Sequence, residues 1–238
     1  MKKLDHRNTQ NELMDDPDLE IQTLKAVFVD INRVNSLLAA HHMVKNKVWQ
    51  TVQGDTEKDY TLYDFGCGDG NLLRELADYL RKKKVRFKMV GLDISPKAIA
   101  IAKEASKAYP EISYSKVNIL KEENSMERCD ILLCGLTLHH FKTEDIPLLL
   151  ERFQSITNIE IIINDLKRSY WACLWFKIIS TLFIKTKIAK NDGLVSIKSG
   201  FIKPEIEGFA NQLKTAVHDF KWYPNYRFIW SIKQPQFN

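Results

Sequence analysis

The sequence predicts an α/β fold in which a doubly wound, mostly parallel sheet carries helices on both faces. The main observation is the alternation of short apolar runs with helix-periodic segments between residues 60 and 163, which is typical of βαβ units. A second is the nearly continuous apolar run at 129–134, as expected of a strand that is buried on both faces. With 238 residues the chain is long enough for one sizeable core.

The expected elements follow one another at short intervals from residue 60. We expect strands at 60–65, 86–92, 112–117, 129–134 and 159–163, and helices at 71–83, 96–109 and 143–156. Ser95 and Pro96 favour the start of the second of these helices, since serine caps helices and proline is tolerated at the first helical position. Beyond the fifth strand we expect a helical stretch at 169–189, a helix at 203–214, and strands at 216–222 and 227–233.

The residues before the sheet have a different character. Apolar residues recur at helical spacing over 18–49 and predict one or two helices, whereas 51–58 is polar and predicts a linker. We therefore expect residues 1–58 to form a helical cap and linker, and 59–238 to form the main domain. Within that domain, 167–200 would be a helical insertion after the fifth strand that acts as a lid.

A glycine-rich turn follows the first expected strand. Gly66 and Gly68, which flank Cys67, allow a tight turn and let a ligand approach the main chain. Asp93 ends the second expected strand, 23 residues after Gly70, at about the spacing at which a carboxylate binds both hydroxyls of a ribose. A glycine turn alone is weak evidence, but the pairing with Asp93 predicts a nucleoside site.

The negative charge of the turn indicates which kind of nucleoside ligand it would bind. Asp64 precedes the glycines and Asp69 lies among them. Two carboxylates would repel a pyrophosphate and attract a ligand that carries cationic groups. A nicotinamide-dependent dehydrogenase is disfavoured on this ground.

The run from Asp64 to Asn71 and the run from Val90 to Ser95 resemble motifs I and II of the class I S-adenosylmethionine-dependent methyltransferases. The resemblance implies a seven-stranded Rossmann-like sheet and S-adenosylmethionine as cofactor, with S-adenosylhomocysteine as product. It places these residues around the cofactor: Asp64, Gly66, Cys67 and Gly68 at the methionine end, Asp93 at the ribose, and Ile94, Asn118, Ile119 and Cys134 nearby, with Ile94 on the adenine. Asn118 departs from the family, which commonly has an acidic residue there, but its amide oxygen can still accept a hydrogen bond.

Adjacent histidines, His139 and His140, follow the fourth expected strand. Since histidine titrates near neutrality, one of them could take a proton from an acceptor hydroxyl. The alternative, that both only shape the loop or contact the cofactor, stays open. Small-molecule methyltransferases often carry a similar Leu-His-His stretch. No metal site is expected, because the fourth strand ends without a carboxylate and only Asn164 and Asp165 follow the fifth.

Composition excludes several other classes. Net charge is only +5, and the clearest basic run, 81–84, lies at an expected helix end, where the dipole favours cations; no nucleic-acid partner is expected. The four cysteines form no CxxC pair, so neither zinc nor disulfides are indicated. Residues 1–10 are polar and lack a signal peptide, and a cytoplasmic location is expected.

The apolar segment 171–184 is too short to span a bilayer. Three interpretations of this segment stay open: a lid over an apolar acceptor, packing in the core, and contact with a membrane surface. Five stretches are similar to bacterial methyltransferases of polyketide and lipid-quinone pathways: 14–17, 31–33, 165–169, 192–196 and 201–205. That similarity implies methylation of a small hydrophobic or phenolic acceptor, most simply on oxygen. Methylation on carbon or nitrogen of a small molecule or macromolecule, and a catalytically silent cofactor-binding protein, remain alternatives; the oligomeric state is not predicted.

Overall fold

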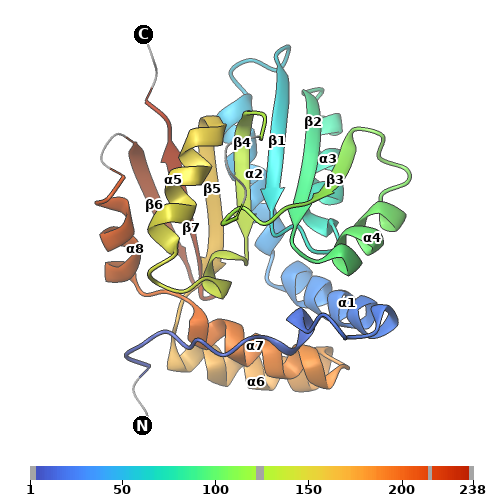
Figure 1. Cartoon of the computed structure of the whole chain (residues 1–238), viewed down its shortest axis with the longest axis vertical. Coiled ribbons are helices and arrows are strands. Elements are labelled where there is room, and N and C mark those ends of the chain that lie inside the picture. The colour runs from blue at the N-terminus through green and yellow to red at the C-terminus, as the bar shows by residue number, and fades with distance from the viewer. Residues whose placement is uncertain (1–3, 122–125, 214–215, 236–238) are drawn as a thin grey trace.

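The computed structural model describes residues 4–121, 126–213 and 216–235. One sheet of seven strands has the order β3-β2-β1-β4-β5-β7-β6, and only β7 runs antiparallel to its neighbours (Figure 1). The strands are β1 Asp59–Phe65, β2 Arg86–Asp93, β3 Ile112–Lys116, β4 Cys129–Gly135, β5 Thr157–Leu166, β6 Val217–Tyr223 and β7 Arg227–Lys233. The order reverses between β1 and β4, which is where an open α/β sheet binds its ligands.

Alternation along the central strands divides the core between the two faces of the sheet. In β4, Leu132 and Cys134 belong to one buried cluster, whereas Ile131 and Leu133 belong to the other, as the two-residue period of a strand requires. The helices α3 Asn71–Lys82 and α4 Pro96–Ala105 pack on the second cluster, and α5 Ile146–Ile156 and α8 Lys203–Ala210 pack on the first. The predicted doubly wound, mostly parallel seven-stranded fold is confirmed.

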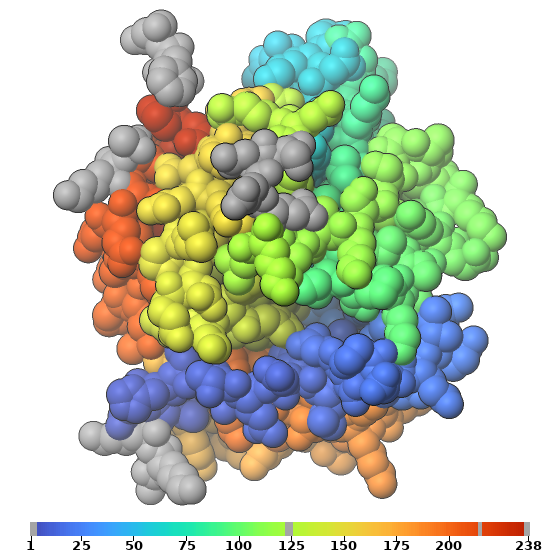
Figure 2. All heavy atoms as spheres, viewed as in Figure 1, coloured from blue at the N-terminus to red at the C-terminus, as the bar shows by residue number. Residues whose placement is uncertain are grey.

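The region before the sheet forms two helices, α1 Ile21–Leu37 and α2 Ala40–Val52, after a short turn η1 Leu13–Asp15. Ala39 between them has a positive φ of 51°, a left-handed conformation that ends α1. The N-terminal segment runs along the lower face of the molecule beside α7 Lys187–Ser199 (Figures 1 and 2). Together, α1, α6 Tyr170–Phe183 and α7 lie below the carboxyl ends of the parallel strands.

The helical stretch expected at 169–189 is present, but it consists of two helices and extends to residue 199. The helix is interrupted at Lys185 and Thr186. Their main-chain N–H groups both donate hydrogen bonds to Asp30 Oδ2, at 2.9 and 2.7 Å. Thr186 then caps α7 through its side chain, which accepts from Ala189 N. The partner of these N–H groups, Asp30 on α1, lies more than 150 residues away in the sequence. Among the described residues no helix is long and apolar enough to cross a membrane.

Candidate active site

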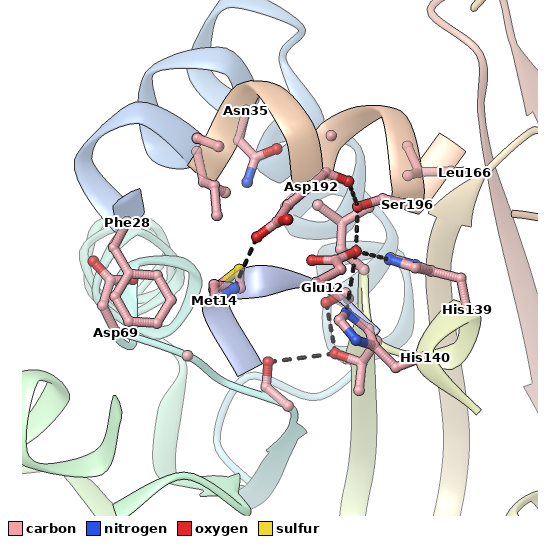
Figure 3. A pocket seen from close by; sticks show the side chains of 18 of the residues that line it. Glu12, Met14, Phe28, Asn35, Asp69, His139, His140, Leu166, Asp192 and Ser196 are labelled. Carbon is pink, nitrogen blue, oxygen red and sulfur yellow. Dashed lines mark hydrogen bonds and ion pairs between the residues drawn. The ribbon is translucent and has the colours of Figure 1, made fainter. Parts of the chain in front are cut away.

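A cavity of about 1070 Å³ lies between the carboxyl edge of the sheet and the layer formed by α1, α6, α7 and the N-terminal segment. Its wall includes the glycine turn after β1, the end of β2, and the loop after β4. It also includes side chains from segments distant in sequence, such as Met14, Phe28 and Asp192 (Figure 3). The cavity is therefore assembled by the sheet edge on one side and by helices on the other.

The turn after β1 needs glycine for its conformation. Gly66, Gly68 and Gly70 have φ of 75°, 54° and 73°, which other residues rarely adopt. A Cβ on Gly66 would lie 2.1 Å from Thr137 Oγ1, and one on Gly70 would lie 2.2 Å from the Tyr114 hydroxyl. Leu92 O accepts hydrogen bonds from Gly66 N and Cys67 N, at 2.8 and 3.1 Å, and so joins the turn to β2.

Asp93 is held by the main chain on both sides. Its Oδ2 accepts from Gly68 N at 2.9 Å and its Oδ1 from Ser95 N at 2.8 Å. Burial raises the pKa of Asp93, and the two N–H donors partly offset that effect. Each carboxylate oxygen has a second lone pair free for a ligand hydroxyl. The geometry fits the predicted contact with a ribose diol.

Asp64 lies at the end of β1 and is almost fully buried, with 2% exposure. Burial, with the nearby charge of Asp93, raises the pKa of Asp64 to about 8. Since Asp64 lines the cavity, a cationic group bound there would favour its ionised form. This is the arrangement expected for a ligand with an ammonium or sulfonium group.

The other residues predicted to bind the cofactor divide into two groups. Cys67, Ile94, Asn118 and Ile119 line the same cavity, and Ile94 is 61% exposed at its edge. Cys134 lies in the core with a fully buried side chain, and it is the next residue, Gly135, that lines the cavity. At this strand end the side chain of Cys134 points into the core.

The two histidines, which the sequence could not tell apart, have different environments. His139 is buried, its Nδ1 lies 2.7 Å from Asp165 Oδ1, and its Nε2 faces Glu12 Oε1 at 3.4 Å as an ion pair (Figure 3). Burial alone would lower the pKa of His139, but the charge and hydrogen bond of Asp165, with Glu12, raise it to about 10. Asp165 and Glu12 together thus favour the imidazolium form of His139 over the neutral ring.

His140 is the more exposed of the pair and lines the cavity. Its Nδ1 lies 3.1 Å from Asp15 Oδ2, and its Nε2 lies 3.8 Å from Glu12 Oε1. The ring lies against that of His139, with centroids 4.5 Å apart and the ring planes tilted by 31°. A carboxylate on Nδ1 fixes the tautomer and leaves Nε2 as the site for a proton.

Glu12, His139 and His140 place three potential metal-ligand atoms within 4.8 Å of one another. The imidazolium of His139, between Glu12 and Asp165, balances charge in this cluster, and Ser196 Oγ also donates to Glu12. Hydrogen bonds and ion pairs thus explain the arrangement. The expectation that no metal is needed stays a prediction.

Sequence reasoning assigned no role in the site to the residues before α1. The segment is fixed to α7, since Asp192 accepts from Leu13 N and Met14 N, both at 2.9 Å. It is also fixed to the loop after β4, because Arg7 donates to His139 O and Phe141 O, both at 3.0 Å. The similarity of residues 14–17 to polyketide-pathway enzymes was the one feature of the sequence analysis that pointed to a role for this segment in the site.

The helical side of the cavity is mostly apolar. These residues from α1, α6, α7 and their connections line it: Ile31, Val34, Leu38, Ala172, Trp175, Phe176, Ile179, Ile184, Ala189 and Ile197. Gly193 in α7 permits this packing, because a Cβ there would lie 2.0 Å from the Phe176 ring. The cavity thus has a polar, acidic end at the sheet and an apolar end at the helices.

Comparison with known proteins agrees with this arrangement. Residues 62–158 match the family described as a methyltransferase domain. A curated relative, a small RNA 2'-O-methyltransferase of Arabidopsis thaliana, is 33% identical over 93 residues, which are 35% of this chain and only 9% of that protein.

Solved structures extend the likeness to most of the chain. The plantazolicin methyltransferase BpumL, solved with a monoazolic desmethylPZN analogue and S-adenosylhomocysteine, superimposes with a TM-score of 0.65 at 16% identity, over 89% of this chain and 90% of that one. Magnesium protoporphyrin IX methyltransferase from Synechocystis PCC 6803, also with S-adenosylhomocysteine, gives 0.56 at 17% identity, over 82% and 84%. At these identities the likeness shows the fold. Residues 62–158 thus form a methyltransferase domain, and most of the chain has the fold of methyltransferases that were solved with S-adenosylhomocysteine.

Proposed function

We propose that the protein transfers the methyl group of S-adenosylmethionine to the oxygen of a small, apolar, phenolic acceptor. The observation that carries this proposal is one continuous cavity whose sheet end has Asp64 and Asp93 and whose helical end is apolar. At about 1070 Å³ the cavity is at the upper limit for one ligand, for which roughly 300–1,000 Å³ is usual. It has room for cofactor and acceptor together.

His140 is the residue that takes the acceptor proton in this proposal. Asp15 on its Nδ1 orients the ring, and its partial exposure in the cavity makes Nε2 accessible to a hydroxyl. His139 has a different role, because its Nδ1 faces Asp165 and its Nε2 faces Glu12, so neither ring nitrogen is directed at an acceptor. We assign His139 as a positioning residue, whose ring packs against the tilted ring of His140.

S-adenosylmethionine supplies an already activated methyl group on a sulfonium. The residues of this chain would place an acceptor oxygen in line with that methyl group and exclude water, which together account for much of the acceleration in such transfers. Glu12 and Met14 from the N-terminal segment and Phe176 from α6 close the cavity. The N-terminal segment and the insertion 167–200 would act together as the lid, because Asp192 joins them.

The test is turnover with a panel of substituted phenols, in which formation of S-adenosylhomocysteine is measured by mass spectrometry. We expect His140→Ala to lower kcat by about 10²–10⁴-fold, the usual contribution of a general base. The matched control is His42→Ala, on an exposed surface of α2, which leaves kcat unchanged. NMR of the product identifies the methylated atom.

Two results would contradict the proposal. A product methylated on carbon or nitrogen would exclude oxygen as the acceptor atom. Intact binding of S-adenosylhomocysteine without turnover of any panel member would favour a catalytically silent protein.

A further inference from the structure

The outer face of α6 carries a stripe of exposed apolar side chains. Five residues one turn or less apart form this α6 stripe, which consists of Trp171, Leu174, Trp175, Ile178 and Leu182, with exposures of 61, 39, 53, 50 and 73%. Tyr170 and Phe183 at the two ends are also exposed. A single exposed apolar residue needs no explanation, but a contiguous group marks an interaction surface.

The charges around the α6 stripe have one sign. Between residues 166 and 191 the sequence has six cationic residues, Lys167, Arg168, Lys177, Lys185, Lys187 and Lys190, and no aspartate or glutamate. Arg168 is paired with Glu205, whereas Lys167, Lys177, Lys185 and Lys187 are exposed. The surface that carries the apolar stripe is therefore basic.

This combination identifies the kind of partner. A second copy of the chain would place lysines against lysines, since a two-fold interface brings the same patch together, and like charges in an interface are unfavourable. An anionic lipid surface has the complementary charge, and tryptophan and tyrosine favour the level of its headgroups. We propose that α6 docks the protein on anionic membranes, with its apolar stripe inserted in the plane of the interface.

The position of α6 connects this surface with the cavity. Its outer face is the stripe, whereas Ala172, Phe176 and Ile179 on its other side line the cavity. Trp175 belongs to both, being half exposed and part of the cavity wall. Figure 1 shows α6 at the lower edge of the molecule, where a flat surface could reach it. An apolar acceptor dissolved in the bilayer could then enter beside Trp175, a step that rests on the proposed function.

The experiment is co-sedimentation of the whole protein with phosphatidylcholine vesicles that contain or lack phosphatidylglycerol. We expect binding to the anionic vesicles that weakens with salt, since surface attraction is screened. Trp171→Ser and Leu182→Ser should each weaken binding by about tenfold, because each removes an inserted apolar side chain. Lys185→Glu should weaken it by at least about fivefold, the effect of one cation near the surface.

Val217→Ser is the matched control, since Val217 is 65% exposed on β6, and it should bind vesicles as the native chain does. All variants should bind S-adenosylhomocysteine normally, which separates this proposal from the proposed function. Absence of vesicle binding, or equal binding by the α6 variants, would overturn it. So would a concentration-dependent dimer that Leu182→Ser abolishes, because α6 would then face a second copy.

Discussion

The carboxylate of Asp165 at the end of β5 binds His139 twice: Oδ1 lies 2.7 Å from Nδ1 of the ring, and Oδ2 accepts from the main-chain N–H at 3.1 Å. This buried contact thus joins the end of β5 to the short turn that follows the parallel strand β4. Glu12 lies on the other side of the ring. The N-terminal segment is therefore attached to the sheet through a charged histidine.

This contact predicts that stability depends on pH. The pKa of His139 is raised from 6.5 to about 10 by Asp165 and Glu12 against the opposing effect of burial. The stabilisation is therefore complete below about pH 6.5 and is lost as the pH rises through 10. We expect the free energy of unfolding to fall between pH 6.5 and 10 in urea titrations, and His139→Gln to reduce that slope. His42→Ala should keep the native slope; an unchanged slope in His139→Gln would show that His139 is neutral in the folded protein.

Asp64 predicts that cofactor binding releases a proton. Burial and the charge of Asp93 raise its pKa to about 8, so the carboxyl group is mostly protonated at pH 7, and a bound cation would ionise it. Calorimetry in buffers of different ionisation enthalpy should show release of about one proton, and affinity should fall about tenfold per pH unit below pH 8. Asp64→Asn should abolish both effects. If the native chain released no proton, Asp64 would be ionised before binding.

The position of Asp93 predicts that its removal weakens binding of the nucleoside. Asp93→Ala should weaken binding of S-adenosylhomocysteine by about 100-fold or more, because hydrogen bonds to a charged group contribute roughly 1.5–3 kcal/mol each. The substitution also removes the acceptor of the hydrogen bonds that Gly68 N and Ser95 N donate. Asp59→Ala, on a side chain that is 84% exposed, is the control and should bind normally. Equal affinity of both variants would place the ribose elsewhere.

The sequence predicted the parts of this site that local chemistry determines. Gly66 and Asp93 could be found because a tight turn and a strand-end carboxylate leave a mark at fixed spacing, and both line the cavity. Glu12 and Asp15 could not be assigned, because their partners His139 and His140 lie more than a hundred residues away. The break at Thr186 depends in the same way on Asp30.

The conformation of Gly66 predicts that adding one methyl group in the turn lowers the stability of the protein. Its φ of 75° is unfavourable for alanine, and a Cβ would lie 2.1 Å from Thr137 Oγ1. Gly66→Ala should lower the free energy of unfolding by about 1–3 kcal/mol, the usual cost of such strain, and should weaken cofactor binding because the turn would shift. Gly208 in α8 offers the matched control, since nothing lies within 4 Å of its Cβ position. Gly208→Ala should raise stability by about 0.5–1 kcal/mol, as alanine does within a helix. If the two substitutions had the same sign in urea unfolding, the backbone at Gly66 would not be strained, and the turn would need another explanation for its glycines.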